Sequence, residues 1–274
     1  MAKTHSNDQM TQRNRSGEEG DSSKTILITG VSQGIGRALA LELAKRGHTI
    51  IGCARSQNKL DSLQLELSDA SLRNHLLFNL DVRSNDKVRE MARTVKDKIG
   101  APDIIVNNAA IMSEKMKMWE IAAEMFHDVI DINIKGTVNI LRHFIPLLIP
   151  KSQGIIVNIS SLFGKMGGVQ ASAYCSSKWA IEGLSKSVAK ELPNGMTIVA
   201  LDPGIINTER SVSYLGSIAS QYQSPQEWAL KAAPMILNLT SVDNGASLHV
   251  DDPGELPNDD FICFGEKNSN ASIE

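Results

Sequence analysis

Short apolar runs rich in β-branched residues alternate along the chain with stretches of helical periodicity. The runs are continuous rather than alternating, as in strands that are buried on both faces of a sheet. They predict strands at 25–29, 49–53, 76–78, 104–106, 155–159 and 197–201, with 247–250 as a weaker seventh. Helices are expected near 35–46, 57–68, 84–99, 120–149, 174–192 and 225–240. The alternation predicts an α/β fold, with a single doubly wound parallel sheet and helices on both faces.

The composition changes at both ends of this block. Residues 1–23 contain few apolar side chains and are expected to form a disordered tail. Residues 252–274 are expected to be a C-terminal extension, in which Phe261–Phe264 could dock as an edge strand or stay loose. Residues 24–251 between them form one continuous predicted domain. The net charge of −3, from 28 basic and 31 acidic residues, argues against nucleic acid or an anionic membrane as a partner.

Several features favour a cytoplasmic protein with free thiols. No apolar run approaches the ~20 residues of a spanning helix, and residues 1–23 lack the apolar stretch of a secretory signal. Three cysteines, Cys53, Cys175 and Cys263, are an odd number with no zinc-ligand spacing. The histidines form no ligand pair, so no metal is expected.

A glycine-rich segment, Thr29-Gly30-Val-Ser-Gln-Gly34-Ile-Gly36, follows the first predicted strand and opens a helix. Glycine permits a tight turn and lets backbone N–H groups approach a pyrophosphate, which the positive end of the helix attracts. Doubly wound sheets bind ligands at the carboxyl ends of their strands. The segment therefore predicts a dinucleotide site.

The end of the second strand indicates which dinucleotide binds. It carries Arg55 and no carboxylate, whereas an acidic residue there would bind the ribose hydroxyls of NAD. A charge pair at ~4 Å is worth ~4 kcal/mol at an effective dielectric constant of ~20. Arg55 therefore favours NADPH, the alternative being a solvated surface charge. Asp81, after the third strand, could accept the adenine amino group or cap the following turn.

Tyr174 and Lys178 lie four residues apart, on one helix face if the helix begins near Tyr174. A nearby ammonium favours phenolate, so the pair predicts a tyrosine whose pKa is lowered toward a value useful for proton transfer. Ser160 and Ser161 end a strand, which places their hydroxyls at the predicted crevice.

These motifs, taken in order, resemble the short-chain dehydrogenase/reductase family over about 24–251. The matching positions are the Thr29–Gly36 loop, Asn107-Asn108-Ala109, Asn133, Ser161, Tyr174-x-x-x-Lys178 and Pro203-Gly204-x-x-x-Thr208. The resemblance implies a Rossmann fold and a carbonyl reductase. It implies that Tyr174 is the general acid, that Lys178 holds the nicotinamide ribose and lowers the Tyr174 pKa, and that Ser161 polarises the substrate carbonyl. Asn133 would support a proton-relay water, and Ser160 would be a non-catalytic neighbour.

The same resemblance implies a set of cofactor contacts, with Asn107 beside the adenosine part. They are Gly30, Ser32, Gln33, Gly34, Ile35, Gly36, Arg55, Asp81, Val82, Asn108, Ala109, Tyr174, Lys178, Pro203, Gly204, Ile206 and Thr208. Gln33 stands where many NADP-dependent members carry a cation. Arg55 would therefore bear the 2′-phosphate largely alone, with Ser32 as a possible second contact.

Within the family, runs such as 37–48, 51–56 and 178–184 resemble reductases that convert pterin-6-aldehydes to 6-hydroxymethylpterins with NADPH. The substrate would then meet Ser161, Tyr174 and Phe163. Phe163, Trp119 and Tyr214 could stack on a flat ring or serve as ordinary packing.

Two alternatives and one further expectation accompany this interpretation. A 3-oxoacyl group, a quinone or a steroid ketone could be the substrate instead. An NADP-binding sensor is the non-enzymatic alternative, although the complete set Asn133, Ser161, Tyr174 and Lys178 argues against it. The helices near 120–149 and 174–192 carry more apolar residues than one sheet face needs, which together with the family resemblance implies a homodimer or homotetramer.

Overall fold

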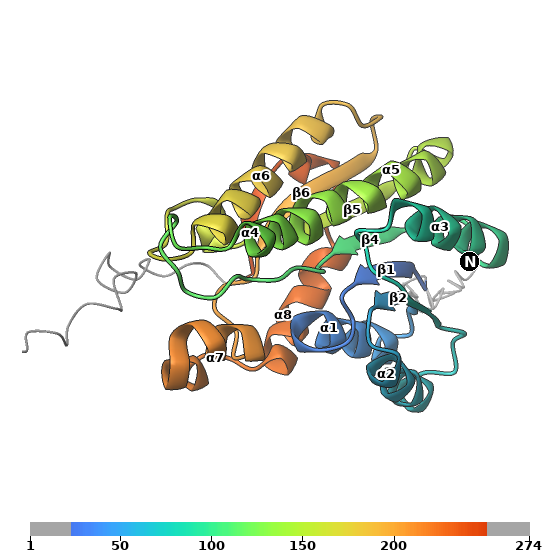
Figure 1. Ribbon diagram of the computed structural model, residues 1–274. Coiled ribbons are helices and arrows are strands. Elements are labelled where there is room, and N and C mark those ends of the chain that lie inside the picture. The colour runs from blue at the N-terminus through green and yellow to red at the C-terminus, as the bar shows by residue number, and fades with distance from the viewer. Residues whose placement is uncertain (1–22, 251–274) are drawn as a thin grey trace, which may run out of the picture.

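A computed structural model describes residues 23–250, which are built around one parallel sheet of seven strands (Figure 1). The strands are β1 Thr25–Thr29, β2 Thr49–Ala54, β3 Leu76–Asn79, β4 Ile104–Asn107, β5 Gly154–Ile159, β6 Met196–Asp202 and β7 Ser247–His249. Their order in the sheet is β3-β2-β1-β4-β5-β6-β7, and every pair is parallel. All seven predicted strands and the predicted fold class are thus confirmed. The expected disordered tail, the C-terminal extension with its possible edge strand and Cys263 lie outside the described residues, apart from Ser23.

Helices cover both faces of the sheet. They are α1 Gly34–Lys45, α2 Gln57–Ala70, α3 Asn85–Lys98, α4 Ala123–Ile130, α5 Thr137–Leu148, α6 Ser172–Ala189, α7 Glu209–Leu215 and α8 Pro225–Leu237. Figure 1 shows α1, α2 and α8 below the sheet and α3, α4, α5 and α6 above it. None of the helices in the described part of the chain is long and apolar enough to cross a membrane.

The core consists of two layers, one on each face of the sheet, because successive side chains of a strand point to opposite faces. Ile26 and Ile28 of β1 pack into the layer that contains Trp228 of α8. Leu27, between them, packs into the opposite layer with Phe144 of α5. The β1 strand is therefore apolar at every position that the helices cover, which explains its continuous hydrophobic run.

The predicted helical stretch over 120–149 is confirmed as one continuous helix from Ala123 to Leu148, which contains a π-helical turn. This π-helical segment, Asp131–Gly136, connects α4 to α5. Gly136 lies so close to Val82 that a Cβ atom built on it would be 2.5 Å from Val82 Cγ2. The sequence prediction did not distinguish this π-helical turn from the α-helix on either side of it.

Smaller differences occur at other helices. The helix expected at 174–192 begins two residues earlier, at Ser172, and the helix expected at 225–240 ends at Leu237. The short helix α7 was not predicted. It belongs to a segment between β6 and α8 that lacks a regular apolar stripe.

The carboxyl ends of β1 and β4 are joined by side-chain hydrogen bonds. Thr29 Oγ1 accepts the backbone N–H groups of Asn108 and Ala109, both at 3.0 Å. The Asn108 amide donates to the carbonyl oxygens of Thr29 and Gly30. This joint lies where the strand order reverses, so the helices that follow β1 and β4 lie on opposite faces of the sheet and a crevice opens between them (Figure 1).

Candidate active site

A cleft of about 1950 Å³ opens at the carboxyl ends of the strands. Common ligand pockets measure roughly 300–1,000 Å³, so the cleft has room for a dinucleotide and a second molecule. The predicted site residues that line it are Gly30, Ser32, Gln33, Gly34, Ile35, Arg55, Asp81, Val82, Asn108, Ala109, Ser161, Phe163, Tyr174, Pro203, Gly204, Ile206 and Thr208. Gly36, Asn133 and Lys178 are buried and do not line it.

The glycine-rich loop has the backbone geometry that an anion site requires. Gly30 and Gly34 have positive φ angles of 73° and 60°, and a Cβ on Gly30 would lie 2.9 Å from Ala109 Cα. A Cβ on Gly36 would collide with the Asn108 side chain and with the Gly30 carbonyl, so Gly36 lets the loop close rather than facing the cleft. The Gln33 side chain does not cap α1. The backbone N–H groups at this helix end can therefore receive a pyrophosphate.

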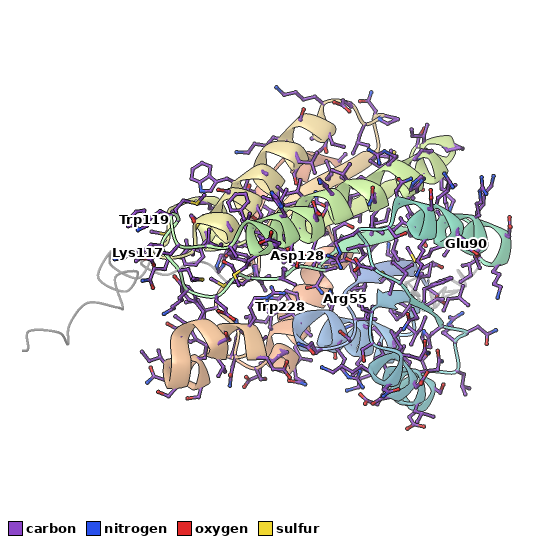
Figure 2. The ribbon with its side chains drawn as sticks, in the orientation of Figure 1. Arg55, Glu90, Lys117, Trp119, Asp128 and Trp228 are labelled. Carbon is purple, nitrogen blue, oxygen red and sulfur yellow. The ribbon has the colours of Figure 1, made fainter. Side chains whose placement is uncertain are left out.

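Two cations line the cleft where β2 ends. Arg55 follows β2, and Lys59, which the sequence analysis missed, lies in the first turn of α2. Lys59 Nζ donates to Gln33 Oε1, and its backbone carbonyl accepts a 3.1 Å hydrogen bond from Arg37. Figure 2 labels Arg55 near β2 and α2, away from Lys117 and Trp119 at the other side of the molecule. The two cations fit a phosphate on the adenosine ribose.

Asp81 lines the cleft and also closes the turn that follows it. Its Oδ1 accepts the Arg83 N–H at 2.9 Å, and its Oδ2 accepts the Arg83 guanidinium. Burial tends to raise the pKa of this carboxyl. The hydrogen bonds and charge of Arg83, with the charge of Arg55, outweigh burial and hold the pKa below its usual value.

Asn107 was expected beside the adenosine part of the cofactor, and the structure does not place it there. Its amide donates to Asn158 Oδ1 at 2.8 Å inside the protein. Asn107 ends β4, and adjacent residues of an extended chain point to opposite sides, so only Asn108 faces the cleft.

Tyr174, Ser161 and Lys178 come together from β5 and α6. Tyr174 lies in the first turn of α6, and Lys178 Nζ lies 5.4 Å from the centroid of its ring. The ammonium donates to the Ile159 carbonyl at 2.7 Å. Ser161 follows β5, lines the cleft together with Tyr174 and lowers the pKa of its phenol, whereas Ser160 donates to buried Glu182 at 2.6 Å. The structure therefore brings Ser161, and not Ser160, to the phenol.

Burial is the largest cause of the pKa shifts of both Tyr174 and Lys178. It raises the Tyr174 pKa, and the nearby Arg210 and Ser161 lower that pKa only in part. Burial also lowers the Lys178 pKa to about 7, helped by the charge of Arg210 and opposed by Asp202 and Glu182. The sequence predicted a lowered Tyr174 pKa. That prediction is wrong for this structure because desolvation outweighs the neighbouring charges.

Asn133 lies in the π-helical segment, behind the cleft. Its Oδ1 accepts the Ile111 N–H at 2.8 Å, and its amide donates to the Ile111 carbonyl and to Ser177 Oγ, each at 2.9 Å. Asn133 thus fixes the loop after β4 against α6. Its part in a proton relay stays a prediction.

Aromatic rings border the cleft beside Tyr174. Phe163 makes edge-to-face contacts with Tyr174 and with Tyr214, at centroid distances of 6.3 and 5.7 Å. Trp119 also lines the cleft but is 80 % exposed, with Lys117 over its ring. Of the three rings proposed from the sequence, Phe163 and Tyr214 form one surface and Trp119 lies apart from it.

Arg210, in the first turn of α7, is a second cleft residue that the sequence analysis missed. It donates to the Ala110 carbonyl at 2.5 Å, and its positive charge lowers the pKa of the Tyr174 phenol. Among the described residues, no group of three or more histidine, cysteine or acidic side chains could hold a metal ion.

The fold and this cluster define a dinucleotide-dependent oxidoreductase. The family model for short chain dehydrogenase matches residues 24–215, and the chain belongs to this family. It is 61% identical over 227 residues to the NADPH-dependent pterin aldehyde reductase of Arabidopsis thaliana, covering 83% of this chain and 93% of that protein.

More distant relatives share the family and the fold. The 3-oxoacyl-[acyl-carrier-protein] reductase of Staphylococcus epidermidis is 34% identical over 185 residues, covering 67% of this chain and 75% of the relative. Among solved structures, a short chain dehydrogenase from Shigella flexneri in complex with NADP superposes with a TM-score of 0.76 and 25% identity, covering 83% of this chain and 96% of that one.

We expect Tyr174→Phe to abolish most carbonyl reduction. The variant keeps the ring that packs on Phe163 but loses the proton donor, so kcat should fall at least ~10²-fold while dinucleotide affinity stays unchanged. Steady-state kinetics and a fluorescence titration of the reduced dinucleotide check this. Tyr222→Phe, at another tyrosine that lines the cleft, is the control and should keep near-normal turnover. Near-normal turnover by Tyr174→Phe would show that the proton comes from another group.

Proposed function

We propose that the chain is an NADPH-dependent reductase of pterin-6-aldehydes, which it converts to 6-hydroxymethylpterins. The main support is the 61% identity to a pterin aldehyde reductase over nearly the whole of that protein. The residues of the cleft also support this proposal. Ser161 and Tyr174 line it where a carbonyl can be reduced, and Arg55 and Lys59 line it at the end of β2, where they can bind the 2′-phosphate of NADPH.

The residues around Tyr174 account for reduction of a carbonyl group. The nicotinamide of NADPH supplies a hydride when it is bound. Ser161 and Tyr174 hydrogen-bond the substrate oxygen, and Tyr174 Oη delivers the proton that the developing alkoxide requires. Lys178 is held by the Ile159 carbonyl, and its pKa of about 7 leaves part of it protonated near neutral pH, when its positive charge helps Tyr174 to release its proton.

The aromatic surface fits a flat heterocycle. Phe163 and Tyr214 are joined edge to face, and the Tyr214 hydroxyl donates to the Val169 carbonyl at 3.0 Å. Both side chains are held in place and line the cleft next to the phenol of Tyr174. A pterin ring can stack there while its aldehyde reaches Ser161.

A comparison of substrates tests the proposed function. NADPH oxidation should be fastest, by kcat/KM, with pterin-6-aldehyde and at least ~10-fold slower with 3-oxoacyl thioesters, quinones and steroid ketones. A clear preference for 3-oxoacyl thioesters would support instead the activity of the 34% identical relative. No reduction of any compound, with NADPH still bound, would favour a sensor.

The preference for NADPH should depend on both cations at the end of β2. Arg55→Ala should weaken NADPH binding ~10- to 150-fold, the effect of losing a charge-assisted hydrogen bond worth ~1.5–3 kcal/mol, and should leave NADH nearly unchanged. Lys59→Ala should weaken NADPH in the same selective way. Titration of both cofactors by nicotinamide fluorescence measures the effects.

The matched control is Lys45→Ala, which removes an exposed lysine from the far end of α1. It should change neither affinity. If Arg55→Ala weakens the binding of NADPH and NADH equally, this arginine does not bind the 2′-phosphate.

We further infer a homodimer or homotetramer and a cytoplasmic location. Trp179 on α6 is 54 % exposed, although it is a large apolar side chain on a long helix. Its exposure supports an interface along α5 and α6. Cys53 and Cys175 are free thiols, as a reducing compartment favours.

Light scattering during size-exclusion chromatography should give at least twice the 29.8 kDa mass of the chain. Trp179→Glu should shift the mass toward one chain, because a buried interface does not tolerate an unpaired carboxylate. Leu72→Glu, at an equally apolar and fully exposed position after α2, should leave the mass unchanged. A monomeric wild-type protein at micromolar concentration would contradict the assembly.

A further inference from the structure

Arg210 is held in a defined direction by the cap of α7. Thr208 is the N-cap residue, and it forms a capping box with Ser211, whose N–H donates to Thr208 Oγ1 at 3.3 Å and whose Oγ accepts the Thr208 N–H at 2.8 Å. The first turn of α7 is therefore fixed. Arg210 extends from it across the cleft to the Ala110 carbonyl.

The guanidinium lies beside the group that the reaction uses. It lies close enough to the Tyr174 phenol to lower the pKa of that group, as the Ser161 side chain also does, and all three residues line the cleft. A substrate carbonyl that meets Ser161 and Tyr174 must therefore place its oxygen next to Arg210. Among the described residues, no carboxylate forms an ion pair with Arg210, and the residue is exposed within the cleft that it lines.

An arginine in this position offers more than a positive charge. The guanidinium is a planar fork of five N–H donors, which matches two acceptor atoms lying side by side. The bond to the Ala110 carbonyl leaves further donors for a ligand. A carbonyl whose neighbouring carbon belongs to a ring C=N bond presents such a pair of acceptors, the oxygen and the ring nitrogen.

We propose that Arg210 is a specificity-determining residue that contacts the substrate and selects carbonyl compounds with a hydrogen-bond acceptor on the adjacent carbon. This inference rests on the proposed function in so far as the carbonyl is reduced at Tyr174. A pterin-6-aldehyde has this arrangement, because its aldehyde is attached next to a ring nitrogen. Many other aldehydes share it, so the inference can be tested without a pterin.

The charge of Arg210 supplies a second, independent readout. Burial raises the Tyr174 pKa and Arg210 lowers it, so loss of Arg210 should raise that pKa further. In the direction of alcohol oxidation, Tyr174 must accept a proton, and activity rises as the pH passes its pKa. The rising limb of the pH profile should therefore move to higher pH in a neutral variant.

The decisive experiment compares two isomers, pyridine-2-carbaldehyde and pyridine-4-carbaldehyde, with NADPH. Both are small aldehydes on the same electron-poor ring, but only the first has a ring nitrogen adjacent to the carbonyl. The wild type should favour the 2-isomer in kcat/KM. In Arg210→Met this preference should fall ~10-fold or more, the loss expected for a charge-assisted hydrogen bond. Comparing the ratio between proteins cancels the intrinsic reactivity of each aldehyde.

Two further variants separate a substrate contact from a structural role. Arg210→Lys keeps the charge but not the fork, so it should keep the pH limb near that of the wild type and lose most of the preference. Lys96→Met is the control, because it removes an exposed charge on α3, outside the cleft, and should keep both the ratio and the pH limb. Far-UV circular dichroism and NADPH affinity establish that the variants fold.

The outcomes distinguish the inference from the proposed function. If Arg210→Met slows both isomers equally, Arg210 only closes α7 against the loop at Ala110 and the inference is wrong. It is also wrong if the wild type does not favour the 2-isomer, or reduces neither. If pterin-6-aldehyde is not reduced but the ratio depends on Arg210, the inference holds and the pterin assignment fails.

Discussion

The side-chain hydrogen bonds that join the carboxyl ends of β1 and β4 determine the shape of the active cleft. The Thr29 hydroxyl accepts two backbone N–H groups of the loop after β4, and the Asn108 amide returns hydrogen bonds to the loop after β1. The two loops consequently approach each other so closely that Gly30 has no space for a side chain beside Ala109. This contact fixes the position of the glycine-rich loop and of the segment after β4, which form the floor of the cleft. It also sets the direction in which the chain continues toward Asn133.

At the reaction centre, desolvation is the dominant electrostatic effect. Tyr174 and Lys178 are both buried, and burial favours the neutral form of each. The Lys178 pKa of about 7 reflects a balance, in which Arg210 acts with burial while Asp202 and Glu182 act against it. Asp202 accepts the Gly204 N–H through Oδ1, so the same carboxylate shapes the loop after β6 and favours the charged lysine.

The sequence predicted the sheet and the central residues of the site because both depend on local signals. A strand buried on two faces must be apolar throughout, and Tyr174 and Lys178 are neighbours on any helix that contains them. The residues that it missed depend on contacts between distant segments. Arg210 reaches a carbonyl 100 positions earlier in the chain, from a short helix with no apolar stripe. Lys59 faces the cleft only because α2 starts at Gln57. Asn107 points into the protein because the adjacent Asn108 points toward the cleft.

The joint between β1 and β4 also constrains the order in which the chain can fold. Ile26 of β1 pairs with Ile104 of β4, and the two strands between them in the sequence, β2 and β3, lie on the other side of β1. Closing so long a loop costs chain entropy before the new contacts form, and parallel sheets with such pairings fold slowly. During synthesis β1, β2 and β3 can associate early, but the crevice has no second wall until β4 has left the ribosome. The cofactor pocket therefore depends on a pairing between strands that are far apart in the sequence, although its glycine-rich loop is among the first segments to be made.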